Sequence, residues 1–160
     1  MSTVTPQLRP YRPDDLDALL ALFQASVHEL SASHYDPAQR RAWAPESVDR
    51  QAWALRLAAQ QVQLGECQGQ LAGFIGFDLG GHIDLLFSHP AHARRGVAQA
   101  LYQAAETQLR GAGARLVHTE ASLLAQPFFA RQGFMVVERQ EVQRDGVSLP
   151  RALMHKTLSC

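Results

Sequence analysis

The chain has 160 residues, of which 46% are hydrophobic and 19% are charged, and this composition is typical of one ordinary globular domain. Equal numbers of basic and acidic residues give a formal net charge of zero, which disfavours an electrostatic nucleic-acid binder. No apolar run approaches the roughly 20 residues that span a bilayer, and no secretion-signal pattern opens the chain. We therefore expect a single domain over residues 1–160, cytoplasmic, with neither nucleic acid nor membrane as a partner.

The first 60 residues are predicted to form one short strand and three helices. Prolines limit the strand to an edge position. The first helix begins at an acidic cap and continues because leucines recur at helical spacing. The second helix opens with a cap residue followed by proline, which is the favoured order. The predicted elements are a strand over 8–12 and helices over 14–30, 36–43 and 48–60.

The remaining 100 residues are predicted to be mostly strands. Glycine-containing turns separate the first three strands, which indicates an antiparallel meander. A helix that begins at Gly96 crosses to a further strand, and a short helix stopped by Gly133 leads into a hairpin. The pattern predicts an α+β (mixed α/β) fold. The predicted strands cover 62–67, 71–78, 82–88, 116–120, 134–143 and 148–157, and the helices cover 96–109 and 125–131.

The strand–loop–helix at 82–109 carries the clearest functional signal. Its loop delivers Arg94, Arg95 and Gly96 to the start of a helix. Free amides at a helix N-terminus and the helix dipole favour negative charge, and arginine adds charge-assisted hydrogen bonds. Gly96 also permits a tight turn and close approach of the backbone to a phosphate. This segment by itself predicts an anion site, although an ordinary basic loop or a nucleotide-binding loop has the same pattern.

Two segments in sequence order narrow this prediction. The run from Ala93 to Ala98 matches the pattern Gln/Arg-x-x-Gly-x-Gly/Ala, except at its first position. The run from Ser122 to Phe134 matches Asn-x-x-Ala-x-x-Leu-Tyr-x-x-x-Gly-Phe at several positions. With these motifs, the chain resembles the GNAT superfamily of acyl-CoA-dependent N-acetyltransferases over essentially its whole length. Further segments at 25–37, 42–44, 83–87 and 127–129 are similar to the YafP-type branch of that superfamily.

The resemblance implies a fold and an activity. The GNAT fold is a central, mostly antiparallel, twisted sheet of about seven strands, flanked by helices and splayed between strands 4 and 5. The implied activity is direct transfer of an acetyl group from acetyl-CoA to a primary amine in a ternary complex. The acceptor would be a small molecule or a peptide, and the protein would be a monomer or a homodimer. The alternative is an inactive acyl-CoA-binding or sensor protein.

The resemblance also implies which residues hold acetyl-CoA. Part of the strand over 82–88 would bind the pantetheine arm and the thioester carbonyl, the loop would bind the pyrophosphate, and the second motif would contact the pantetheine. The candidates are Leu86, Phe87, Ser88, Ala93, Arg94, Arg95, Gly96, Val97, Ala98, Ser122, Ala125, Phe128 and Phe129.

Three of these positions depart from the family pattern. Ala93 lacks the usual polar side chain, and Ser122 replaces asparagine. Phe129 stands where the family frequently has a tyrosine that protonates the thiolate. Another group could supply that proton, the thiolate could leave unassisted, or the protein could bind acyl-CoA without transferring the acyl group. Because free thiols have pKa values near 8.5, and loss of general acid catalysis typically costs about 10²–10⁴-fold, we expect an enzyme.

Two carboxylates are candidate bases for the amine proton. Strand alternation predicts that His82, Asp84, Leu86 and Ser88 share one face. Apolar neighbours are expected to raise the pKa of Asp84, which suits a base, although the carboxylate could instead pair with an arginine. Glu120 is the second candidate, and its alternative is a solvated strand end. His82 is expected to be a surface residue at a strand end.

The acceptor pocket is expected to lie under the region around residue 30. His28, His34 and Tyr35 are candidate acceptor-binding residues, although loop residues of this kind more often pack or cap. Trp43 and Trp53 are interpreted as core or pocket-wall aromatics.

The sequence predicts no metal site. His89 and His92 lack a third metal-ligating partner. Cys67 and Cys160 form no disulfide framework and no metal-ligand spacing, and Cys67 is expected to be a buried thiol.

Overall fold

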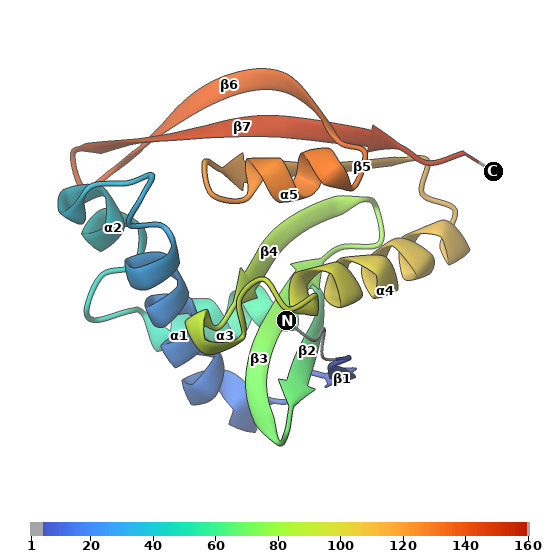
Figure 1. Cartoon of the computed structure of the whole chain (residues 1–160), viewed down its shortest axis with the longest axis horizontal. Coiled ribbons are helices and arrows are strands. Elements are labelled where there is room, and N and C mark those ends of the chain that lie inside the picture. The colour runs from blue at the N-terminus through green and yellow to red at the C-terminus, as the bar shows by residue number, and fades with distance from the viewer. Residues whose placement is uncertain (1–4, 160) are drawn as a thin grey trace.

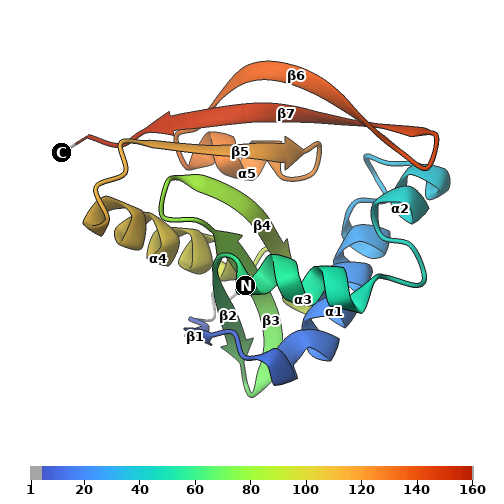
Figure 2. The same ribbon diagram turned by 180° about the vertical axis from the view of Figure 1, so that it is seen from behind.

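The computed structural model describes residues 5–159 as a seven-stranded sheet with helices packed on both faces (Figures 1 and 2). The strand order is β1-β2-β3-β4-β5-β7-β6, and only β4 and β5 are parallel neighbours. The predicted mixed fold is therefore confirmed. The elements are β1 (Gln7–Pro10), α1 (Leu16–Ala25), α2 (Pro37–Trp43), α3 (Arg50–Ala58), β2 (Gln61–Cys67), β3 (Gln70–Phe77), β4 (His82–Ser88), α4 (Val97–Gly111), β5 (Leu116–Ser122), α5 (Gln126–Arg131), β6 (Met135–Arg144) and β7 (Val147–Thr157).

The prediction of one continuous helix over 14–30 is wrong in part. The chain forms a 3-10 turn at Pro13–Asp15, the regular helix α1, and then a π-helical turn at Ser26–Leu30. The apolar spacing is helical throughout, so periodicity alone does not detect the change of winding. The predicted cap of α2 is confirmed, since the Asp36 carboxylate accepts a hydrogen bond of 2.7 Å from the Gln39 amide.

Two apolar cores lie on opposite faces of the sheet. One contains the stripe of α4 formed by Val97, Leu101, Ala105 and Leu109, each at most 1% exposed. The other contains the leucines of α1 and Leu57 of α3. The predicted burial of Cys67 is confirmed, and Cys160 lies outside the described residues. Within residues 5–159, no helix is long and apolar enough to cross a membrane.

The sheet is splayed between β4 and β5, as the resemblance implies. Only two residue pairs, His82 with His118 and Ile83 with Thr119, join these strands. The His118 amide donates to the Gly81 carbonyl at 2.9 Å, and the Thr119 hydroxyl donates to the Ile83 carbonyl at 2.9 Å. Beyond these contacts the two strands diverge (Figure 1).

A β-bulge at Asp84 overturns the predicted alternation of β4. Gly76 pairs with Leu85 and Phe77 pairs with Ile83, so Asp84 is an extra residue without a partner in β3. One extra residue shifts every later side chain to the opposite face. Leu86 accordingly packs against the core beneath α4, whereas the Asp84 carboxylate contacts α3 on the other face. The four side chains predicted to share a face therefore do not.

Candidate active site

A cleft of about 520 Å³ lies where β4 and β5 diverge. Its walls come from these two strands, from α3 and the segment before it, from α5, and from the β6–β7 hairpin. Among the residues predicted from sequence, the structure places the following on the cleft wall: Tyr35, Asp84, Leu86, Phe87, Glu120, Ser122, Ala125 and Phe129. The cleft thus joins segments that lie far apart in the sequence, from Phe23 to Arg151.

The loop before α4 forms an open backbone turn. Arg94 has a φ of 61° and Gly96 a φ of 88°, so two positions of the loop adopt the left-handed region. No side chain caps α4, and the Ala100 amide is the donor that reaches the Gly96 carbonyl, at 3.0 Å. The amides of the first turn, which include Val97 and Ala98, therefore point away from the helix without intrahelical partners. The arrangement is suited to bind an anion.

Gly73 in β3 positions this loop, and the sequence analysis missed it. A Cβ at Gly73 would lie 2.8 Å from the Val97 side chain and 2.9 Å from the Phe87 carbonyl. The glycine therefore allows the start of α4 to pack directly on the sheet beside the end of β4. A glycine within a strand is the signal that could have indicated such a close approach.

The second motif closes the cleft with aromatic side chains. Phe129 is 2% exposed and packs edge-on against Tyr102, with ring centroids 6.3 Å apart, and against Phe134. The Ser122 hydroxyl oxygen accepts a hydrogen bond of 3.2 Å from the Ala125 amide. Phe129 thus faces the cleft with no hydroxyl, and Ser122 supplies a polar group near it.

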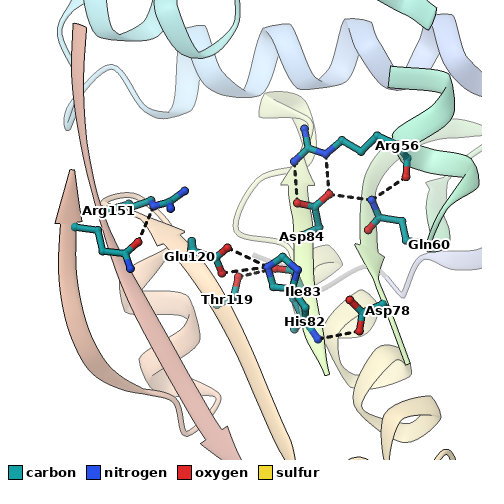
Figure 3. Close-up of polar contacts among 10 residues, drawn as sticks. Arg56, Gln60, Asp78, His82, Ile83, Asp84, Thr119, Glu120 and Arg151 are labelled. Atoms are coloured by element: carbon teal, nitrogen blue, oxygen red, sulfur yellow. Dashed lines mark hydrogen bonds and ion pairs between the residues drawn. The ribbon is translucent and has the colours of Figure 1, made fainter. Parts of the chain in front are cut away.

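Asp84 is held by two residues of the first half of the chain. Its carboxylate accepts hydrogen bonds of 2.7 and 2.8 Å from the Arg56 guanidinium and one of 2.8 Å from the Gln60 amide (Figure 3). Burial alone would raise the pKa of Asp84, but the bonds from Arg56 and Gln60 and the charge of Arg56 outweigh it, so the pKa is lowered. The expected rise in this pKa is therefore wrong, and pairing with an arginine is what the structure shows.

Glu120 and His82 form a second polar pair, across the junction of β4 and β5. The His82 Nε2 atom lies 3.0 and 3.1 Å from the two Glu120 carboxylate oxygens (Figure 3). The His82 ring also stacks on His118, with centroids 4.8 Å apart. His82 lies at a strand end, as predicted, but its side chain is only 29% exposed and lines the cleft instead of standing free on the surface.

The three candidate acceptor-binding residues lie in different places. Tyr35 is buried and lines the cleft, where its hydroxyl donates to the Pro150 carbonyl at 2.6 Å and accepts from the Leu123 amide at 2.9 Å. Burial raises the pKa of Tyr35. The His28 Nε2 atom lies 2.7 Å from the Ala44 carbonyl oxygen. His34 is exposed, and the structure does not bring it or His28 to the cleft.

Three arginines on the cleft wall were not predicted: Arg56, Arg144 and Arg151. They come from α3, the end of β6 and β7, and no local motif marks them. For metals, the described part of the chain contains no group of three His, Cys, Asp or Glu residues that could hold an ion.

Comparison with known proteins identifies relatives of this architecture. Residues 31–157 match the acetyltransferase (GNAT) domain family. The chain is 37% identical over 143 residues to the uncharacterized N-acetyltransferase YafP of Escherichia coli (strain K12), and the match covers 88% of each chain.

Two solved structures share the fold. A GCN5-related N-acetyltransferase from Rhodopseudomonas palustris superposes with a TM-score of 0.94 at 35% identity, over 99% of each chain. The PaiA N-acetyltransferase from Thermoplasma acidophilum, solved in complex with coenzyme A, superposes with a TM-score of 0.77 at 16% identity, over 96% of this chain and 99% of that one.

Proposed function

Because this chain belongs to the GNAT acetyltransferase family, we propose that it acts as one domain that moves an acetyl group from acetyl-CoA directly to a primary amine in a ternary complex. The observation that carries the proposal is the uncapped start of α4, which lies next to the open half of β4. The coenzyme A complex of the PaiA relative supports the choice of cosubstrate.

The loop before α4 suits the pyrophosphate of acetyl-CoA, and strand β4 suits its pantetheine arm. The first-turn amides of α4, together with Arg94 and Arg95, provide donors and positive charge for a pyrophosphate. Both arginine side chains are exposed, so they are available to a ligand in solvent. From Leu85 onward β4 pairs with β3 but not with β5, so Leu86, Phe87 and Ser88 can offer backbone groups to an extended pantetheine arm.

Amide formation requires the acceptor amine to lose a proton as its nitrogen attacks the thioester carbonyl and the C–S bond breaks. Bound acetyl-CoA supplies the electrophilic carbonyl and a thiolate leaving group. We assign the base to Glu120, because its carboxylate faces the cleft and its partner His82 can take up and pass on a proton. Asp84 is less suited, since its lowered pKa and its bonds to Arg56 make it a weak base. It instead positions Arg56.

The leaving group has no tyrosine to protonate it. Phe129 lines the cleft without a hydroxyl, and the Tyr35 hydroxyl already donates to a backbone carbonyl. We propose that the thiolate leaves largely unassisted, which is feasible because thiols have pKa values near 8.5. Phe129 is also the observation that favours the second candidate, a protein that binds acyl-CoA without turnover.

The test compares binding and turnover in matched variants. Gly96→Ala and Gly113→Ala both place a side chain at a positive φ, of 88° and 85°, at opposite ends of α4, so they share the cost of backbone strain. Only Gly96→Ala is expected to weaken acetyl-CoA binding, by about tenfold or more, measured by calorimetry. Equal affinity in the two variants would contradict the assigned site.

Two further measurements separate the alternatives. Thermal stabilisation of the wild-type protein by acetyl-CoA, but not by ATP or NAD, would exclude a general nucleotide binder. Release of coenzyme A with any member of an amine panel would exclude the non-catalytic candidate. Tight binding without release across a broad panel would instead support that candidate.

A further inference from the structure

The cleft wall carries three arginines, two of which come from β-strands that follow Glu120 in sequence. Arg144 ends β6 and Arg151 lies in β7, and both line the cleft together with Arg56 of α3. Arginine presents a planar set of donors that matches a carboxylate, so the positions and the pairing of these groups determine what the pocket accepts.

The sheet register places Arg151 close to the proposed base. Arg151 pairs with Ser122, and Leu153 pairs with Glu120, so Arg151 is a diagonal neighbour of Glu120 on the same face. Diagonal neighbours are about 7–8 Å apart, measured between Cα atoms. Figure 3 shows the Arg151 side chain extending from β7 toward the cleft between β4 and β5.

The three arginines of the cleft wall differ in whether a carboxylate already neutralises their charge. Arg56 is bonded by the Asp84 carboxylate, and Arg151 donates at 2.9 Å to the neutral Gln140 amide oxygen. The guanidinium of Arg144 forms no ion pair with residues 5–159. Within residues 5–159, Arg144 and Arg151 therefore have no carboxylate partner, on a cleft wall that also carries the carboxylates of Asp49 and Asp145.

The charged groups around Arg144 agree with the absence of an ion pair at its guanidinium. Its pKa lies below the usual value, first because of desolvation and then because of the charges of Arg56 and Arg151, while Asp145 and Asp84 act in the opposite direction. These carboxylates are its acidic neighbours. Asp84 is bonded by Arg56, and Asp145, which also lines the cleft, is the next residue of the turn.

We propose that the acceptor is an amino carboxylate whose carboxylate binds Arg144 and Arg151 and whose primary amine faces Glu120, an inference that rests on the proposed acetyl transfer. The cleft wall then offers Glu120 to the amine and the guanidinium groups of Arg144 and Arg151 to the carboxylate. The cleft wall also includes Trp43 and Trp53, which suit an apolar or aromatic side chain on the acceptor.

The experiment measures acetylation of the common amino acids beside their carboxamides, by coenzyme A release with acetyl-CoA in excess. An amide keeps the amine and the side chain and removes only the negative charge. For at least one pair we expect kcat/KM to be about tenfold or more higher for the amino acid, because a charged hydrogen bond is lost in the amide. Arg144→Gln should bring that ratio toward one, and Arg151→Gln should lower it as well.

Arg139→Gln provides the matched control. Arg139 is exposed on β6 and pairs with Ala152, so it lies on the opposite face of the sheet from Arg151. This variant should keep the wild-type preference. Equal or better acetylation of the amides by the wild type overturns the inference, as does a preference that neither Arg144→Gln nor Arg151→Gln changes.

Binding distinguishes this inference from the proposed function. If acetyl-CoA gives no thermal shift, the proposed function itself fails. Acetyl-CoA could bind while amino acids give no product and raise Tm no further than their amides do. That result would overturn the inference about the acceptor carboxylate and leave cosubstrate binding intact.

Discussion

Gly81 provides a sharp test of the junction between β4 and β5. Its φ of 118° lies in a region that other residues rarely adopt, and its carbonyl accepts the hydrogen bond from His118. A Cβ added here would lie 2.2 Å from the Leu116 carbonyl oxygen, a backbone atom at the start of β5. Gly81→Ala must therefore displace β5 from β4.

The expected cost follows from these contacts. The positive φ costs about 1–3 kcal/mol for a non-glycine residue. Displacing β5 by about 1 Å adds a steric term of about 1–3 kcal/mol and weakens the hydrogen bond from His118. The free energy of unfolding should thus fall by about 3 kcal/mol or more. Gly113→Ala has a similar φ of 85° but no atom within 4 Å of its Cβ, so only the strain of about 1–2 kcal/mol applies.

Thermal unfolding of both variants measures the difference. For a chain of this length, 1 kcal/mol corresponds to about 2–4 °C in Tm, so we expect losses of about 10 °C for Gly81→Ala and about 4 °C for Gly113→Ala. Urea unfolding at fixed temperature gives the free energies directly. Equal losses in the two variants would refute the close backbone contact at the junction.

Three other changes test the proposed chemistry. Glu120→Gln should lower kcat by about 10²–10⁴-fold with unchanged acetyl-CoA affinity, and an unchanged kcat would remove the base assignment. Because the pKa of Asp84 is lowered in the folded state, its carboxylate stabilises the fold above about pH 4, and this contribution is lost as the pH falls through the lowered pKa. Urea unfolding should therefore show Asp84→Asn to be less stable than wild type at neutral pH, and the difference should shrink as the pH falls below about 4. A difference that stays constant down to low pH would contradict the pairing with Arg56. Phe129→Tyr should raise kcat in steady-state assays, because it restores a proton donor for the leaving thiolate. It should also lower Tm, because the side chain is 2% exposed and the new hydroxyl would be buried. A folded variant with unchanged kcat would show that a hydroxyl at this position does not reach the leaving group.

Local patterns predicted most of the elements. The bounds of β4 agree at both ends with the prediction, and α4 begins directly after Gly96, within one residue of the predicted start. The two failures have a common cause. The π-helical turn at Ser26–Leu30 and the bulge at Asp84 are changes of period inside otherwise regular segments. The bulge depends on where β3 pairs with β4, which the sequence of β4 alone does not contain.

The site was predictable only where a motif is contiguous. The loop over 93–98 and the second motif over 122–134 are short contiguous segments, so their residues could be named as candidates from sequence. The pairing of Asp84 with Arg56 and the meeting of Glu120 with His82 join residues 28 and 38 positions apart. The charged partners of these residues are set by tertiary contacts that no local pattern contains. For this reason the expected direction of the Asp84 pKa shift was wrong, and Arg144 was overlooked.

The divergence of β4 and β5 also bears on self-association. Unpaired strand edges are templates on which strands of other molecules add, and soluble proteins usually block them. Here β4 and β5 diverge (Figure 2), and the cleft between them is lined by residues of α3 and the β6–β7 hairpin. A foreign strand approaching from outside meets those walls first. The proposed cosubstrate would reach these backbone groups from within the cleft, whereas a strand of another molecule would have to pass the cleft walls.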